Sequence, residues 1–452
     1  MPVFVWLLSV VATLAFSSLA AADPAATTQP GDDGGVTPAT ETVAPPPTRA
    51  EPQPDLDALA RRVSELEGRS AAASEPPREP PVPASNVVVR AAPGKGFTVS
   101  TLDDRFSVTM RLRLQLRDTF TDGPTVPATN ELNVKTLRLV THGHVLDKAL
   151  RYSVQLAFGG NDYDVNASPI LDAYVEHVGL RDLNVRVGQY FVPFDRARTM
   201  REFALEMVDR PFAARELALD RDIGIMASSD DFLGTKVVGY RLFAGGGEGR
   251  NRFGGERPGP LGVVRLILRP WGMFDDDIEG DLARDDHPRL AIGVGAAYNR
   301  LTNRPQSTYG TAFTLGQVDY MHGAVDAIFK MSGFSLLAEG LIRRSSDEHL
   351  DAIVAGAPKR EYAREGHAYL VQTGMMLTSQ VQLVGRWEQV FARRGTDPQL
   401  TALVDTQGNQ LGGGANLYLN GHAFKVQADY FVLFGDAPDQ RHVVRLQLDA
   451  SF

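Results

Sequence analysis

The 452-residue chain contains no cysteine, which excludes disulfide scaffolds, thiolate metal sites and cysteine nucleophiles together. It also lacks an excess of basic residues, because its formal net charge is -9 at pH 7, and this argues against nucleic-acid binding. Beyond its N-terminal segment the sequence has no run of about 18 apolar residues, which excludes membrane-spanning helices. A mean hydropathy of -0.17 is ordinary for a soluble protein, but a large barrel with only one apolar face gives the same value.

The N-terminal segment is the one long apolar run. Residues Phe4 to Ala22 are almost wholly apolar and end in three alanines before Asp23. Small residues at that position fit signal-peptidase cleavage, so we expect residues 1–22 to be an export signal. No Lys or Arg precedes the apolar run, and an uncleaved anchor is the alternative.

Residues 23–94 are rich in Pro, Ala, Thr and Glu and cannot bury a core, so we interpret them as a periplasmic linker. Apolar residues recur within this linker at spacings of three and four: Leu56, Leu59, Val63 and Leu66. The spacing predicts a short coiled-coil-like helix over residues 55–67. Two heptads cannot hold a coiled coil alone, so this helix needs a trimeric barrel to gather three copies. A frayed helix in a disordered arm is the alternative.

From Arg105 to the last residue the apolar period is two. In residues 106–116 every even position is apolar, while the odd positions are Ser, Thr, Arg or Gln. About sixteen such segments follow one another, and a closed antiparallel barrel requires an even number. We therefore predict an all-β fold, a transmembrane antiparallel β-barrel of about sixteen strands over residues 95–452. A soluble β-sandwich also has half-buried strands, but the number and length of these strands disfavour it.

Connection lengths alternate between short turns and longer polar loops, as expected for periplasmic turns and outer loops. The segment from Pro270 to Pro288 is an exception. It falls where a short turn is expected, yet it is long and carries five acidic residues between Asp275 and Asp281. Either this segment is an elongated turn or the strand count slips there.

The C-terminal segment ends in an alternating strand whose last residue is aromatic. Its apolar positions are Val444, Leu446, Leu448, Ala450 and Phe452. A lipid-facing strand of this kind resembles the signal read by the barrel-assembly machinery of outer membranes. The expected partners are therefore this machinery, through the Phe452 strand, together with outer-membrane lipid and lipopolysaccharide.

One stretch carries a family resemblance. Residues 188–194 read GQYFVPF, residues 207–211 read MVDRP, and residues 221–225 read RDIGI. A second echo is Gly333-Phe334 with Ala338-Glu339 downstream. These motifs resemble the phosphate-selective porin O and P family, and the resemblance extends over residues 95–452. It implies a sixteen-stranded, trimeric outer-membrane barrel whose third outer loop folds inward and narrows the pore.

By strand count that third loop is Val192 to Asp222, and its acidic and basic residues nearly balance. The loop alone therefore does not dictate ion selectivity. The candidate constriction residues are Arg196, Arg198, Arg201, Glu206, Asp209 and Arg210.

The phase of each strand predicts which charged side chains face the lumen, where arginine forks match phosphate or carboxylate oxygens. The candidate pore-lining, anion-binding residues are Arg111, Arg113, Arg117, Arg138, Arg151, Arg186, Arg241 and Arg265. The first three form a column on one strand, along which an anion could step. The alternative is that each arginine is paired with an acid of a neighbouring strand and supports the wall.

These observations predict a passive diffusion channel for small anions such as phosphate. We expect no catalysis, no cofactor and no metal site, because His142 and His144 lack a nearby carboxylate and no His-x-Ser pair supports a barrel phospholipase. One alternative is a structural envelope barrel whose N-terminal arm contacts peptidoglycan or a periplasmic partner. Another is a non-selective or cation-preferring porin, if Glu206 and Asp209 dominate the constriction.

Overall fold

The computed structural model of this chain describes residues 56–73, 86–159, 168–252, 259–393 and 395–452. The chain divides into two compact units, Met1–Pro81 and Val82–Phe452. The expected export signal, residues 1–22, lies outside the described residues. None of the described helices combines the length and the apolar character needed to cross a membrane.

The described part of the first unit is one helix, α2 (Leu56–Ala73). It starts one residue after the expected position and continues six residues beyond the expected end. Its apolar stripe is open to solvent, since Leu59, Val63 and Leu66 are 48%, 49% and 61% exposed. Nothing in the described part of this unit covers the stripe.

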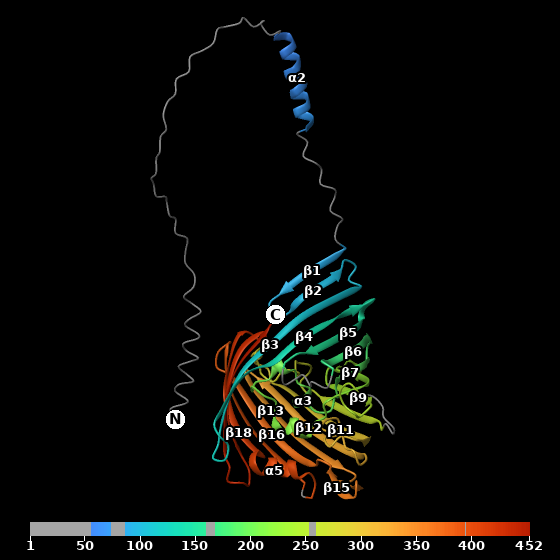
Figure 1. Cartoon of the computed structure of the whole chain (residues 1–452), viewed down its shortest axis with the longest axis vertical. Coiled ribbons are helices and arrows are strands. Elements are labelled where there is room, and N and C mark those ends of the chain that lie inside the picture. The colour runs from blue at the N-terminus through green and yellow to red at the C-terminus, as the bar shows by residue number, and fades with distance from the viewer. Residues whose placement is uncertain (1–55, 74–85, 160–167, 253–258, 394) are drawn as a thin grey trace, which may run out of the picture. The chain divides into compact units, whose positions relative to one another are not determined.

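The second unit is a closed antiparallel β-barrel, as predicted (Figure 1). Within the described residues sixteen strands form its wall, because β20 pairs with β3 and closes the sheet. The strands are β3 (Phe106–Asp122), β4 (Thr129–Val145), β5 (Asp147–Ala157), β6 (Ile170–Leu180), β7 (Leu183–Phe191), β8 (Arg221–Ser229), β9 (Val238–Gly245), β10 (Leu261–Leu268), β11 (Arg289–Thr302), β12 (Val318–Met331), β13 (Phe334–Ser345), β16 (Gly366–Met376), β17 (Val381–Ala392), β18 (Asn409–Asn420), β19 (Phe424–Phe434) and β20 (Arg441–Ser451).

The predicted alternation appears directly as alternating exposure. Along β10, for example, Val264, Leu266 and Leu268 are about half exposed on the outside, whereas Arg265 and Ile267 are buried inside. An uninterrupted outer face of large apolar side chains is unfavourable in water and favourable in hydrocarbon. The outer surface therefore has the chemistry of a lipid-facing wall.

A hairpin of β1 (Val87–Ala92) and β2 (Gly96–Thr101) extends the sheet at the closing seam. Strand β2 pairs with the first part of β3, from Ser107 to Met110, and β20 pairs with the remainder, from Arg113 onward. Figure 1 shows the C-terminus beside this hairpin. The first strand thus begins inside the segment expected to be linker, because three consecutive valines favour a strand and β3 offers an unpaired edge.

We call the end where β3 begins and β20 ends the terminal rim, and the opposite end the loop rim. Connections at the terminal rim have one to eight residues, the longest of these carrying the 3-10 turn η2 (Phe232–Gly234), except for the one between β10 and β11, which spans residues 269–288. The segment flagged in the sequence is therefore an elongated turn, and the strand count does not slip. The loop rim carries longer connections, which include a hairpin of β14 (His349–Val354) and β15 (Ala357–Tyr362) and the helix α5 (Pro398–Gln407).

Candidate functional site in the barrel lumen

The third connection at the loop rim, residues 192–220, folds into the barrel, and we call it loop 3. It contains α3 (Arg196–Thr199), the 3-10 turn η1 (Glu202–Ala204) and α4 (Phe212–Leu217). Phe194, Leu217 and Leu219 are fully buried and belong to one apolar cluster with inward-facing wall residues of β10 to β17. Burial of this much apolar surface holds the loop firmly against that side of the wall.

Wall carboxylates also bind the backbone of loop 3. The Oε2 atom of Glu339 accepts the amides of Arg196 and Ala197 at 3.0 and 2.9 Å. In the same way Glu388 accepts the amide of Ala213 at 2.9 Å, and Asp429 accepts that of Val208 at 3.0 Å. These acids therefore satisfy loop amides that would otherwise be buried without a partner, which is costly.

Residues 269–288 enter the lumen from the opposite rim, and we call them the inward turn. Asp276, Glu279 and Asp281 of this turn are buried. The turn meets loop 3 directly: the amide of Glu279 donates to the carbonyl of Ala204 at 3.3 Å, and the amide of Glu206 donates to Glu279 Oε2 at 2.6 Å. Two segments from opposite rims thus touch inside the barrel.

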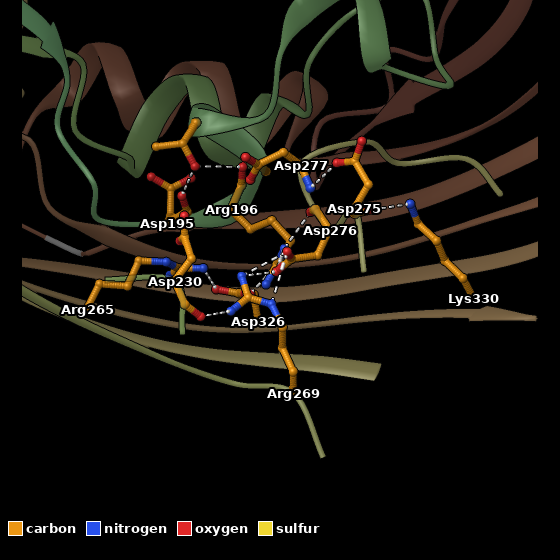
Figure 2. Close-up of polar contacts among 12 residues, drawn as sticks. Asp195, Arg196, Asp230, Arg265, Arg269, Asp275, Asp276, Asp277, Asp326 and Lys330 are labelled. Carbon is orange, nitrogen blue, oxygen red and sulfur yellow. Dashed lines mark hydrogen bonds and ion pairs between the residues drawn. The ribbon is translucent and has the colours of Figure 1, made fainter. Parts of the chain in front are cut away.

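A buried charge cluster ties loop 3, the wall and the inward turn together (Figure 2). Arg196 of the loop contacts Asp326 of the wall at 2.7 Å and Asp276 of the turn at 3.1 Å. The same two acids are held by Arg265 of the wall, at 2.6 Å, and by Arg269, the first residue of the inward turn, at 2.9 Å. Removing one member would leave its partners charged and buried, so the cluster fixes the positions of both segments.

Glu206 of loop 3 lies at the contact with the inward turn. Its carboxylate accepts hydrogen bonds from Ser335 at 2.5 Å, Gln382 at 2.6 Å and Gln372 at 3.1 Å. Burial, together with the neighbouring carboxylate of Glu279, raises the pKa of Glu206 to about 7. The carboxylate is therefore part of the packing between the two segments and titrates near neutral pH.

The two sides of the lumen differ in how much water reaches them. Inward side chains on β10 to β20 are mostly buried under loop 3 and the inward turn; examples are Arg265, Lys330, Gln372, Gln382, Asn416, Gln427 and Gln447. Many inward side chains on the other side are half-buried or exposed; examples are Arg111, Lys135, His142, Arg151, Gln155 and Arg186. Arg113, Thr136 and Arg138 on the same side are buried. We call the inward face of β4 to β7, with the first half of β3, the open wall.

The expected arginine column on β3 is only partly free. Arg113 is buried and makes a bidentate contact with Asp449 at 3.1 and 2.6 Å, and Arg117 contacts Asp209 at 2.9 Å. The side chain of Arg111 has neither an ion pair nor a hydrogen bond among the described residues. The three arginines therefore do not form a continuous row of unpaired charges. Arg113 and Arg117 are paired with acids and support the wall, as the alternative interpretation of the sequence stated.

The other expected lumen arginines are also mostly paired. Their partners are Glu202 for Arg138, Glu176 for Arg186 at 2.8 Å, Asp230 for Arg241 at 3.3 Å and Asp326 for Arg265 at 2.6 Å. Arg151 is exposed and donates only to a neighbouring backbone carbonyl, that of Lys148, at 3.2 Å. Of these five, Arg151 keeps its charge uncompensated by a contacting acid among the described residues.

The expected constriction residues occupy different environments. Arg196 and Glu206 are buried at the contact with the inward turn, and Asp209 accepts from Arg117 and Arg445. Arg198 pairs with Asp220 at 3.0 Å, and Arg210 donates to the carbonyls of Ala197 and Met200. The Arg201 side chain is exposed and has no acid partner among the described residues. Charge on this loop is thus distributed between a buried side and an open side.

Sequence reasoning missed the aromatic rings of loop 3 and of the strand before it. Arg111, Arg113 and Arg201 lie 5.6, 5.6 and 5.9 Å from the centre of the Phe203 ring. Arg198, Arg210 and Arg221 surround the Phe191 ring at 5.6, 5.7 and 3.7 Å. An aromatic face attracts guanidinium groups without neutralising their charge. The only signal in the sequence is the position of each Phe within an arginine-rich stretch.

The described residues offer little for a metal ion. His144 is bound to Ser107 at 2.8 Å and to the carbonyl of Asp104 at 2.8 Å. One group with suitable ligand spacing lies at the terminal rim: Asp285, Asp286 and His287. Its Asp285 is already held by Arg289 at 2.8 Å, so this group is a local ion-pair cluster.

Comparison with solved structures places this architecture among outer-membrane channels. The outer membrane channel DcaP of Acinetobacter baumannii aligns with 79% of this chain and 100% of its own, with a TM-score of 0.50 and 15% identity. OmpF of Salmonella typhi aligns with 77% of this chain and 98% of its own, with a TM-score of 0.51 and 13% identity. The anion-selective porin of Comamonas acidovorans aligns with 76% of this chain and 99% of its own, with a TM-score of 0.49 and 11% identity. No protein-family model and no curated relative matches the chain. The chain thus has the fold of outer-membrane porins.

Proposed function

We propose that this protein is an outer-membrane porin through which small anions such as phosphate diffuse passively. The observation that carries the proposal is positive charge without acid partners on the water-accessible side of the lumen. Among the described residues, Arg111 and Arg201 contact no carboxylate, and Arg210 donates only to backbone carbonyls. Charged side chains that line a wide channel set its ion preference, so this side of the lumen favours anions.

The charges around the two aromatic rings lead to the same conclusion. Seven guanidinium groups gather there, those of Arg111, Arg113, Arg138, Arg198, Arg201, Arg210 and Arg221. Within the part of the chain that the structure describes, they contact the carboxylates of Asp172, Glu202, Asp220 and Asp449. The region keeps a positive excess although the whole chain is acidic. An anion entering from bulk water is therefore attracted to this wall.

The decisive measurement is the reversal potential of the purified protein in a planar bilayer under a potassium chloride gradient. We expect anion-selective current, and we expect Arg111→Ala and Arg201→Ala each to weaken the selectivity, with a larger loss in the double variant. Arg360→Ala is the matched control, because this exposed arginine lies on the β14–β15 hairpin and pairs with Asp351. Cation-selective current from the unmodified protein contradicts the proposal.

The second candidate is a structural envelope barrel. Loop 3 and the inward turn meet inside the lumen, and this observation favours a barrel that passes little current. The exposed stripe of α2 would then serve as a contact to a periplasmic partner or to other copies of the chain. Absence of current after confirmed insertion into the bilayer supports this candidate and eliminates the channel.

A further inference from the structure

Glu202 is the one carboxylate of loop 3 that enters the arginine group around Phe203. It is the first residue of η1, and its side chain is 22% exposed. Its carboxylate forms an ion pair with the guanidinium group of Arg138 on β4. Glu202 therefore reaches from the loop across to the open wall.

The wall opposite Glu202 carries more positive than negative charge. Arg138 lies directly across from Arg113 in the register of β3 and β4, so two guanidinium groups project from adjacent strands. Asp449 contacts Arg113, and Glu202 contacts Arg138. Although burial acts to raise it, the pKa of Glu202 lies well below its usual range because of the charges of Arg138, Arg113 and Arg210. The carboxylate is therefore ionised at every pH at which the channel would work.

Two further guanidinium groups at the Phe203 ring contact no carboxylate among the described residues. Arg201 is the chain neighbour of Glu202. The guanidinium groups of Arg201 and Arg111 lie 5.9 and 5.6 Å from the centre of the Phe203 ring. The ring holds these groups in place by cation–π attraction, which leaves their hydrogen-bond donors free. A cluster of arginines of this kind can bind an oxyanion, and in this cluster the Glu202 carboxylate contacts one of them, Arg138.

We propose that Glu202 is a tethered counter-ion that occupies an anion-binding site formed by Arg111, Arg138 and Arg201. A permeating oxyanion binds at this site by displacing the Glu202 carboxylate from Arg138. The inference deepens the proposed function and rests on it. The ligand class is a small oxyanion, because a guanidinium fork donates to two oxygens of a phosphate or carboxylate group at once.

The tether explains how such a site can exist in a channel. Conduction requires binding that is strong enough to draw an ion in and weak enough to release it. A carboxylate on the loop has a high effective concentration at the site, so it competes with every incoming anion. It thereby lowers the affinity of the site and speeds the release of the anion.

The test is block of chloride current by inorganic phosphate in planar bilayers, compared between the unmodified protein and Glu202→Gln. The amide has nearly the same shape as the carboxylate but no charge. We expect the half-blocking phosphate concentration to fall about tenfold in Glu202→Gln, since one competing charge is lost at close range. Asp405→Asn removes the same charge from the exposed side of α5 and is the matched control.

A cysteine variant tests the same site in channels that have already inserted. The chain contains no cysteine, so Glu202→Cys carries its only thiol. A sulfonate-bearing thiol reagent should raise the half-blocking concentration again, whereas a neutral methyl reagent should leave it low. Equal phosphate block in the unmodified protein, Glu202→Gln and both adducts overturns the inference. The reversal potential of the unmodified protein tests the proposed function separately, because it does not depend on the block.

Discussion

At the scale of single residues, the lumen separates charges that hold the structure together from charges that remain available. Arg113, Arg117 and Arg265 are buried and bound to acids. The guanidinium groups of Arg111 and Arg201 lie over the Phe203 ring and contact no acid among the described residues. Substituting the first kind leaves a buried carboxylate without a partner and threatens folding. The second kind can be substituted with less risk to the fold, so it gives the cleaner test of selectivity.

Glu206 gives a pH prediction at this scale. Its pKa of about 7 lies above the ordinary glutamate value, so the folded protein keeps a proton that the unfolded chain releases. The stability of the unmodified protein relative to Glu206→Gln should therefore fall as the pH rises from about 4.5 to 7, by up to about 3 kcal/mol. Thermal unfolding of both proteins in detergent at pH 5 and pH 8 measures the difference.

A gap between the two unfolding temperatures that does not change with pH contradicts a titrating, buried Glu206. Glu67→Gln, on the exposed face of α2, is the control and should show no change in its gap over the same range.

The sequence predicted which residues face the lumen, but it could not predict their partners. The period of two assigned Arg113 and Arg117 to the inside, where both lie. The partner of Arg113 is 336 positions away, and the two become neighbours only because β20 closes onto β3. The partner of Arg117 lies on loop 3, whose path depends on its apolar packing. Pairing of this kind follows from closure and from loop conformation, and neither is written in local periodicity.

At the scale of elements, the inward turn and loop 3 both reduce the open lumen. The inward turn occupies space beside loop 3 and is held by Asp276 and Glu279. Replacing residues 274–284 with a short Gly-Ser connection should enlarge the free cross-section and raise single-channel conductance. Single-channel recording at fixed salt measures the change, and a conductance equal to or below that of the unmodified protein contradicts the role assigned to the turn.

A matched control for the turn lies at the opposite rim. The β14–β15 hairpin is a separate two-stranded sheet, and residues such as Ile353 and Val354 at its tip are exposed. Shortening this hairpin by the same number of residues should leave the conductance close to its original value.

The two inward segments were not equally visible in the sequence. Loop 3 was anticipated from its place in the strand count and from the resemblance of residues 188–225. The inward turn was detected only as an anomaly of length and acidity. The sequence does not show that these acids are buried, because Arg196, which contacts Asp276, lies 80 positions away on loop 3.

At the scale of the whole molecule, closure depends on the C-terminal strand. Phe452 donates its amide to the carbonyl of Leu112 at 2.9 Å, while the residue as a whole is 61% exposed. Because the backbone contact does not need the ring, Phe452→Ala should refold in detergent with unchanged heat stability. If the ring is read by the assembly machinery, the same variant should reach the outer membrane of living cells at a several-fold lower level.

Quantification of folded barrel in isolated outer membranes measures this effect. Phe424→Ala is the control, because this aromatic also lies at the terminal rim, where it pairs with Ala450, but does not end the chain. Similar losses for both variants would show that any aromatic at this rim matters and that the last residue has no special role.

The double pairing of β3 also has a consequence for the order of events during biogenesis. Residues 107–110 of β3 pair with β2, which lies only a few residues earlier in the chain. Residues 113–122 pair with β20, the last strand of the chain. Until β20 is made, this second part of β3 is an open edge, and such an edge can recruit foreign strands. Because β2 pairs with residues 107–110 of β3, the β1–β2 hairpin leaves a shorter part of that edge unpaired before β20 is added.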